Sequence, residues 1–209
     1  MTVVRSNPDP WLSAWQTAIV AAAGRGPVLE IGCGAGHDTA VLVDMGVDVV
    51  AFDIDGEAVS RAKAAAPAAA VSVQSVLDPF PLEGQGIGVV VASLSLHYFG
   101  WSQTRSIVHR IRRTLREGGL LLARFNSDQD VHHGAIGFPE IERGLYAVNG
   151  LAKRFFSDRD VDALFQGGWR VLSKEHRTST KYERPKALWE VVVSPRRAGA
   201  RCARSTPRP

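Results

Sequence analysis

Short apolar runs alternate with amphipathic stretches along most of the chain. Apolar runs of four to six residues predict buried strands, and apolar positions that recur every three to four residues predict helices. The pattern predicts strands over 28–31, 47–52, 70–73, 87–92 and 120–125, and helices over 7–23, 37–45, 56–66 and 102–117. Strands that alternate with helices favour a parallel sheet covered on both faces.

The pattern changes after residue 125. Residues 126–156 lack a clear period and are predicted to be irregular or partly helical, whereas 157–165 reads as a short helix capped by Ser157. Two further strands, 169–175 and 188–193, are joined by a polar segment without a helical period, which favours a hairpin. The expected fold is therefore α/β, a Rossmann-like doubly wound sheet of seven strands, mostly parallel, with an antiparallel C-terminal edge hairpin.

The length of 209 residues suits one globular domain, which we place at residues 1–193. Residues 194–209 hold five arginines and no acid, while the whole chain has a formal charge of +4, so residues 1–193 carry −1. The basic end is expected to be a disordered Arg/Pro-rich tail, either a solubilising terminus or a weak anchor for nucleic acid or acidic membrane.

Cysteine content and the N-terminal sequence indicate the compartment. Two cysteines do not make a disulfide framework, and residues 1–27 contain neither a signal-peptide pattern nor an apolar run of membrane length. We therefore expect a cytoplasmic protein, with no membrane partner, that is a monomer or a homodimer.

The candidate chemistry begins where the first predicted strand ends. Residues 28–36 read Val-Leu-Glu-Ile-Gly-Cys-Gly-Ala-Gly, so Gly32, Gly34 and Gly36 stand at alternate positions between a strand and a helix. Glycines at that place let a ligand approach the main chain. Neither Gly-x-Gly-x-x-Gly nor a phosphate-binding Gly-Lys-Ser/Thr is present. Without a diphosphate to repel, Glu30 can hold a cationic amino group directly or through water.

A second acid follows at the end of the next strand. Asp53 lies twenty-one residues after Gly32, where a carboxylate accepts hydrogen bonds from ribose hydroxyls. A ligand with an amine at one end and an unphosphorylated ribose at the other describes S-adenosylmethionine.

Residues 28–36 together with Asp53 resemble the first two motifs of the class I S-adenosylmethionine-dependent methyltransferases. The resemblance continues in 78–82, 87–94 and 116–119, and residues from 126 onward loosely resemble tellurite-resistance-type methyltransferases. It implies S-adenosylmethionine as cofactor and a binding set of Glu30, Gly32, Cys33, Gly34, Gly36, Asp53, Ile54, Ser75, Val76, Ser93 and Leu94. Many family members carry an acid for the adenine amino group where Ser75 stands here, and Asp78 is the alternative.

Acceptor groups are expected beyond the ends of the fourth and fifth strands. His97 is a candidate general base, or alternatively a packing histidine, and Tyr98, Arg124 and Asn126 are candidate substrate contacts. The N-terminal helix within 1–27, with Trp11 and Trp15, and residues 126–156 would cover the site. The His/Asp cluster at 128–133 matches no zinc spacing, so no metal site is expected.

These features predict a methyltransferase that acts on a small molecule by in-line displacement. The alternatives are an RNA or protein methyltransferase and a non-catalytic S-adenosylmethionine-binding protein. The charge of −1 on residues 1–193 and the lack of interleaved aromatics among the arginines of 102–117 disfavour nucleic acid as a partner.

Overall fold

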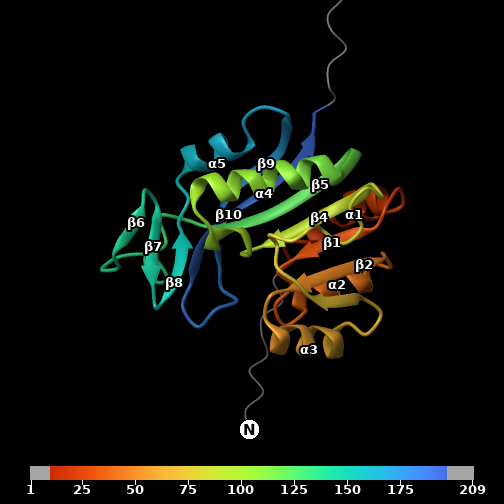
Figure 1. The fold of residues 1–209 in the computed structure, drawn as a ribbon, viewed down its shortest axis with the longest axis horizontal. Coiled ribbons are helices and arrows are strands. Elements are labelled where there is room, and N and C mark those ends of the chain that lie inside the picture. The colour runs from red at the N-terminus through yellow and green to blue at the C-terminus, as the bar shows by residue number, and fades with distance from the viewer. Residues whose placement is uncertain (1–9, 197–209) are drawn as a thin grey trace, which may run out of the picture.

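The computed structural model describes residues 10–196 and contains a seven-stranded sheet between two layers of helices (Figure 1). The strand order is β3-β2-β1-β4-β5-β10-β9. Strands β1 to β5 pair in parallel, and β10 pairs antiparallel with both of its neighbours, β5 and β9. The predicted doubly wound sheet with an antiparallel C-terminal hairpin is confirmed. The strands are β1 (Val28–Ile31), β2 (Val49–Asp53), β3 (Ala70–Val73), β4 (Ile87–Ser93), β5 (Leu115–Asn126), β9 (Trp169–Ser179) and β10 (Lys186–Pro195).

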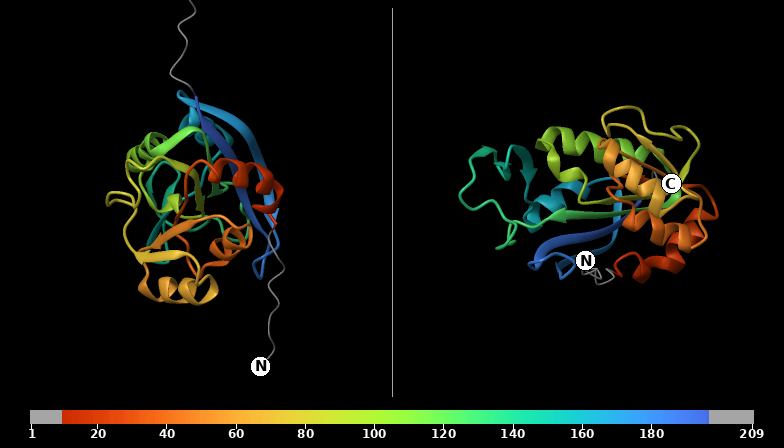
Figure 2. Two further views of the ribbon diagram at one scale, coloured as in Figure 1. Left: turned by 90° about the vertical axis from the view of Figure 1, so that its right-hand side faces the viewer. Right: turned by 90° about the horizontal axis from the view of Figure 1, so that it is seen from below.

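Helices cover the two faces of the sheet (Figures 1 and 2). One face packs against α1 (Gln16–Ala23), α2 (His37–Asp44) and α3 (Gly56–Ala65), and the other against α4 (Trp101–Thr114) and α5 (Asp158–Phe165). Two short 3₁₀ helices, η1 (Ser13–Trp15) and η2 (Leu96–Tyr98), precede α1 and α4 respectively. None of the described helices is long and apolar enough to cross a membrane.

The central strand β4 shows why apolar runs without alternation predicted these strands. Val89 and Val91 belong to the core on the α1–α3 face, whereas Val90 and Ala92 belong to the core on the α4–α5 face. Because both faces are covered, the side chains of residues 89–92 are all apolar, as expected for a central parallel strand.

The prediction for residues 126–156 is wrong. This segment contains a three-stranded antiparallel sheet of β6 (Glu140–Glu142), β7 (Leu145–Val148) and β8 (Leu151–Arg154). Asn149 and Gly150 form the two-residue turn between β7 and β8, both with positive φ, which is the conformation that Asn-Gly favours in hairpins. The Asn-Gly signal was present in the sequence, but β6 and β8 contain charged residues and lack the apolar run that marked β1.

Several predicted boundaries are also wrong. Helix α4 ends at Thr114 rather than at the predicted residue 117, and the chain passes directly into β5. The predicted helix 7–23 starts with η1 at Ser13, and β9 and β10 are longer than predicted. Strand β10 includes Ser194 and Pro195, so the predicted tail starts too early, and residues 1–9 and 197–209 lie outside the described part of the chain.

Candidate functional site

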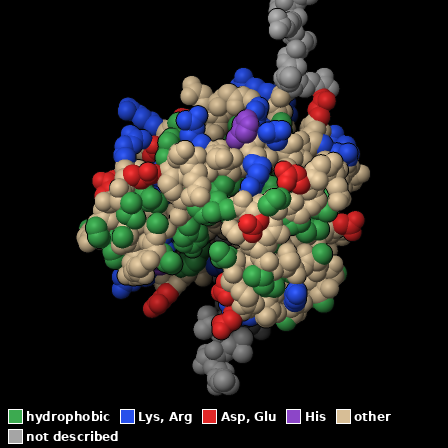
Figure 3. Space-filling view, in the orientation of Figure 1, with side chains coloured by type: hydrophobic (Ala, Val, Ile, Leu, Met, Phe, Trp, Pro, Cys, Tyr) green, Lys and Arg blue, Asp and Glu red, His purple; other side chains and the backbone are tan. Residues whose placement is uncertain are grey.

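A crevice lies at the carboxyl ends of the parallel strands. The chain leads from β1 outward to β2 on one side, and returns to β4 on the other side of β1, so the strand order reverses between β1 and β4. Ligands of doubly wound sheets bind at such a reversal. In the space-filling view this face is hollowed between the three-stranded sheet and the α2–α3 side of the molecule, with apolar side chains along the hollow (Figure 3).

The three glycines after β1 serve two different purposes. A Cβ on Gly32 would lie 2.4 Å from the Cβ of Ser95, and one on Gly36 would lie 2.6 Å from the Cα of Ala62 in α3. These two glycines therefore permit close packing of protein against protein. A Cβ on Gly34 would meet nothing within 4 Å, although its φ of +54° favours glycine. Gly34 is the position of the loop at which a ligand can approach bare backbone.

Asp53, the last residue of β2, holds this loop in place. Its Oδ2 accepts a hydrogen bond of 2.8 Å from the Gly34 N–H, and its Oδ1 accepts one of 3.0 Å from the Asp55 N–H. A carboxylate has about four lone-pair sites. Each oxygen of Asp53 therefore has acceptor capacity for a ligand hydroxyl beside Gly34, so the residues fit a ribose at this place.

Glu30 lies on β1, two residues before the first glycine of the loop. Its side chain is 2% exposed, and its Oε2 accepts a hydrogen bond of 2.6 Å from the Thr39 hydroxyl in α2. Burial raises the pKa of the Glu30 carboxyl to about 8, and the nearby charges of Asp38 and Asp53 act in the same direction against the Thr39 hydrogen bond. A cation in the crevice would favour the charged form of this carboxyl.

Exposed apolar side chains stand at the ends of β2 and β3. Ile54 is 75% exposed and follows Asp53 directly, and Val73, the last residue of β3, is 60% exposed. A Val73 methyl carbon lies 3.8 Å from the position of a Cβ on Gly56, so this side chain flanks the start of α3. Sequence reasoning missed Val73, although an apolar residue at a strand's carboxyl end was the available signal. Together these side chains offer apolar walls for a flat ring.

Ser75 and Val76 have local contacts in the segment after β3. The Ser75 hydroxyl accepts a hydrogen bond of 3.1 Å from the Leu77 N–H. Val76 packs against the α4–α5 face core, and its carbonyl accepts a hydrogen bond from the Arg110 guanidinium. The role of Ser75 and Val76 in cofactor binding remains a prediction.

Cys33 follows β1 and Leu94 follows β4, the two strands between which the strand order reverses. Cys33 is 6% exposed within the α1–α3 face core, and burial raises the pKa of its thiol to about 12, so the thiol stays protonated. Leu94 directly follows Ser93, the end of β4, and has a φ of +54°, which is unusual for a leucine. Its N–H donates to the Arg124 carbonyl at 3.0 Å, which holds the strained turn in place.

His97 and Tyr98 follow on η2. His97 is 4% exposed, and in the described part of the chain its Nδ1 has no hydrogen-bond partner. Burial, followed by the charges of Lys186 and Lys153, lowers the pKa of His97 to about 3, so the ring is neutral at ordinary pH. The Tyr98 ring lies 4.2 Å from it, centroid to centroid, and is 42% exposed. Tyr98 is therefore accessible from solvent with the buried His97 ring packed beside it, and burial, followed by the charge of Asp53, raises the pKa of Tyr98.

The structure separates Arg124 from Asn126, although both lie near the end of β5. The buried Asn126 amide donates to the Arg154 carbonyl of β8 at 3.4 Å, which joins it to the three-stranded sheet. The buried Arg124 guanidinium lies 3.4 Å from the Glu190 carboxylate of β10 and 4.9 Å from the centroid of the Trp11 ring. Arg124 thus belongs to a different neighbourhood, on the α1 side of the sheet.

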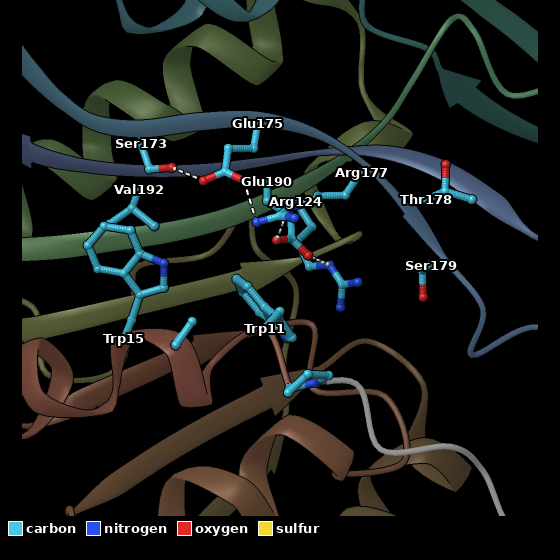
Figure 4. Close-up of a pocket in the computed structure, with 12 residues that line it drawn as sticks. Trp11, Trp15, Arg124, Ser173, Glu175, Arg177, Thr178, Ser179, Glu190 and Val192 are labelled. Carbon is cyan, nitrogen blue, oxygen red and sulfur yellow. Dashed lines mark hydrogen bonds and ion pairs between the residues drawn. The ribbon is translucent and has the colours of Figure 1, made fainter.

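That neighbourhood is a cavity of about 460 Å³ between the N-terminal tryptophans and the strands β5, β9 and β10 (Figure 4). Trp11 and Trp15 form one wall, and polar side chains of the strands form the other, including Arg124, Glu175, Arg177 and Glu190. The Trp11 indole N–H donates to Asp38, in the first turn of α2, at 3.2 Å. Trp11 therefore stands between the glycine-loop side of the crevice and this cavity.

Comparison with known proteins gives consistent similarities. Residues 28–119 match the family described as "Methyltransferase domain". Over 93 residues the chain is 33% identical to an uncharacterized methyltransferase of Synechocystis, covering 44% of this chain and 43% of that protein. Over 95 residues it is 34% identical to a probable S-adenosylmethionine-dependent methyltransferase of Mycobacterium tuberculosis, covering 46% of this chain and 34% of that protein. The chain thus spans less than half the length of these curated relatives.

The fold is shared more widely. A crystal structure of a SAM-dependent methyltransferase from Methanosarcina mazei superimposes with a TM-score of 0.68 at 17% identity, over 81% of this chain and 92% of that one. At this identity the similarity shows the fold, and it extends beyond residue 119 to most of the chain.

Proposed function

We propose that this chain is a class I S-adenosylmethionine-dependent methyltransferase that transfers a methyl group to a small-molecule acceptor by in-line displacement. The match of residues 28–119 to the family described as "Methyltransferase domain" supports the proposal. The observation that carries the proposal is the open backbone at Gly34 next to the Asp53 carboxylate. Packing contacts require the absence of a Cβ at Gly32 and at Gly36, but no packing contact requires it at Gly34.

The residues of the crevice fit the parts of this cofactor. Asp53 would accept hydrogen bonds from the ribose hydroxyls, Ile54 and Val73 would flank the adenine, and Glu30 would face the cationic end through its negative charge. When bound, S-adenosylmethionine supplies a methyl group that its sulfonium sulfur already activates. The chain therefore needs chiefly to align the acceptor with that methyl group and to exclude water.

The groups on the acceptor side are suited to this task. A general base is needed only where the acceptor must lose a proton, and His97, with its pKa of about 3, is a weak base. We place His97 beneath the site, where it supports Tyr98, and Tyr98 at the wall of the crevice. The formal charge of −1 on residues 1–193 disfavours nucleic acid as the acceptor, which supports a small molecule.

Calorimetric titration tests the cofactor assignment. We expect S-adenosylmethionine and S-adenosylhomocysteine to bind and NAD not to bind. Asp53→Ala should weaken binding by about 1–3 kcal/mol, the cost of leaving polar groups unpaired. Asp48→Ala, which removes the same charge at the other end of β2 from an exposed position, is the matched control. Binding of NAD alone, or equal affinities in the two variants, would contradict the proposal.

The acceptor requires a separate experiment. Labelled methyl donor incubated with the full chain and a metabolite extract should yield labelled small molecules. Label recovered only in RNA or protein would favour the alternative acceptors, and no transfer to any acceptor would favour a non-catalytic binding protein. The cytoplasmic location and the monomeric or dimeric state stay predictions, the latter to be checked by light scattering.

A further inference from the structure

We infer that the cavity under Trp11 and Trp15 binds the methyl acceptor, and that this acceptor is an uncharged, planar aromatic molecule with hydroxyl or amine substituents. That the ligand is a methyl acceptor rests on the proposed function. That an aromatic molecule binds in this cavity can be tested independently of the proposed function.

The position of the cavity places it beside the crevice. Arg124, in its wall, is the register partner of Ser93, the residue that ends β4 at the crevice. Trp11 contributes to the same wall while its indole N–H reaches Asp38 at the start of α2. The Trp11 side chain therefore contacts both the cavity and the first turn of α2, the helix that follows the glycine loop.

The two walls of the cavity differ in chemistry. Trp11 and Trp15 are four residues apart, and Figure 4 shows both indoles on the same side, opposite the strands. The strand side carries hydroxyls and charged groups, such as Thr178 and Ser179 at the end of β9. A ligand that fills this space needs one flat apolar face for the indoles and polar groups at its edge. Stacking of aromatic rings adds to the hydrophobic gain in such an arrangement.

The charges in the cavity are already balanced. The Arg124 guanidinium is paired with Glu190 at 3.4 Å, and Arg177 is paired with Glu175 and lies 3.9 Å from Glu190. A carboxylate on the ligand would have to displace Glu190 from a guanidinium, and a cation would have to displace Arg177 from a carboxylate. Both displacements lose an existing pair of charges, so the cavity favours a neutral ligand whose O–H or N–H groups donate to the carboxylates.

In the described structure no helix covers β9 and β10 on the side of the cavity, so the cavity is open there. Helix α1 contacts β4 and β5, and α5 contacts β9 from the opposite face. Toward the tryptophans, β9 presents Ser173, Glu175 and Arg177 rather than apolar side chains. The polar strand face beside two indoles is therefore a built wall rather than an uncovered piece of core.

The test uses 1-naphthol as a neutral planar probe, titrated into the full chain both alone and loaded with S-adenosylhomocysteine, with binding measured by ligand-observed NMR. We expect saturable binding, at least tenfold tighter than that of 1-naphthoate, which adds a charge, and of 1-decalol, which removes planarity. Ala14→Trp, an exposed position that lines the cavity, should abolish probe binding and leave S-adenosylhomocysteine affinity unchanged. Trp15→Ala should weaken the probe at least tenfold, and Val20→Ala, exposed on α1 outside the cavity, should not change it.

The outcomes separate the inference from the proposed function. No saturable binding of 1-naphthol, or equal binding by Ala14→Trp and the unaltered chain, overturns the inference even where S-adenosylhomocysteine binds normally. Probe binding without S-adenosylhomocysteine binding would contradict the proposed function and leave only an aromatic-binding cavity. Methyl transfer from labelled donor to an extract must also fall in Ala14→Trp, since unchanged transfer would mean that the acceptor binds elsewhere.

Discussion

Replacing Glu30 by glutamine should change how the stability of this protein depends on pH. In the folded chain the Glu30 carboxyl is buried and its pKa is raised from 4.5 to about 8. Between these two pH values the unfolded chain loses the proton and the folded chain keeps it. The free energy of unfolding therefore falls as pH rises from about 4.5 to about 8, and the full loss persists above pH 8.

The size of the effect follows from the difference in pKa. Each pKa unit corresponds to about 1.4 kcal/mol, so the full effect is on the order of 5 kcal/mol. Glu30→Gln removes this titration while its amide oxygen still accepts from the Thr39 hydroxyl. The buried amide N–H₂ adds a cost of about 1–3 kcal/mol, but that cost does not vary with pH. The variant should thus gain several kcal/mol relative to the unaltered chain between pH 5 and pH 9.

Urea unfolding followed by circular dichroism at fixed ionic strength, from pH 5 to pH 9, measures the difference. Glu57→Gln, which removes a carboxyl whose side chain is 90% exposed, is the matched control and should give a curve parallel to that of the unaltered chain. Parallel curves for Glu30→Gln as well would refute the reasoning, because Glu30 would then be ionised in the folded protein at neutral pH.

The proton on the Glu30 carboxyl should be released when the cofactor binds, and this release can be measured. At pH 7 a carboxyl with a pKa of about 8 holds about 0.9 proton, and a neighbouring cation favours its release. Calorimetry of S-adenosylmethionine binding in buffers of different ionisation enthalpy should detect the release of nearly one proton. With Glu30→Gln no such release is expected, and equal proton release by both proteins would place its source elsewhere.

Three other predictions concern separate parts of the site. Gly34→Ala should lower stability by about 1 kcal/mol because of its positive φ, yet weaken cofactor binding at least tenfold. Gly36→Ala, whose Cβ would lie 2.6 Å from α3, should lower stability by about 3 kcal/mol. Chemical unfolding measures the stabilities and calorimetry the affinities, and equal cofactor affinities of the two variants would refute the distinction. Arg154→Ala removes an ion pair with Glu142 and hydrogen bonds to two backbone carbonyls, so it should lower the free energy of unfolding by about 3 kcal/mol. Thermal unfolding measures the change, and an unchanged midpoint would contradict this prediction. The pKa of His97 is about 3, so His97 is neutral between pH 5 and pH 9. The pH profile of kcat over this range should therefore have the same shape in His97→Asn as in the unaltered chain. Loss of an inflection in the variant would show that His97 titrates in this range.

Local patterns predicted most of the elements for identifiable reasons. The apolar run of β4 had to be continuous because helices cover both faces, and Ser157 had to begin a helix because its hydroxyl caps the Asp160 N–H while the Asp160 carboxylate accepts from the Ser157 N–H. The three-stranded sheet was missed because β6 and β8 contain charged residues and form no apolar run, although Asn149-Gly150 marked one of its turns.

The candidate site was also predicted in part from the sequence and decided in part by the tertiary structure. The amino-acid sequence by itself determined the doubly wound fold, the glycine loop and the acid at the end of β2, since periodicity and spacing are local properties of a chain. Only the tertiary structure decided that Gly34 alone among the three loop glycines faces open space, because Ser95 and Ala62 approach the other two from distant segments. It also brought Arg124 and Glu190 together beside Trp11, since register across β5 and β10 depends on how the whole sheet pairs.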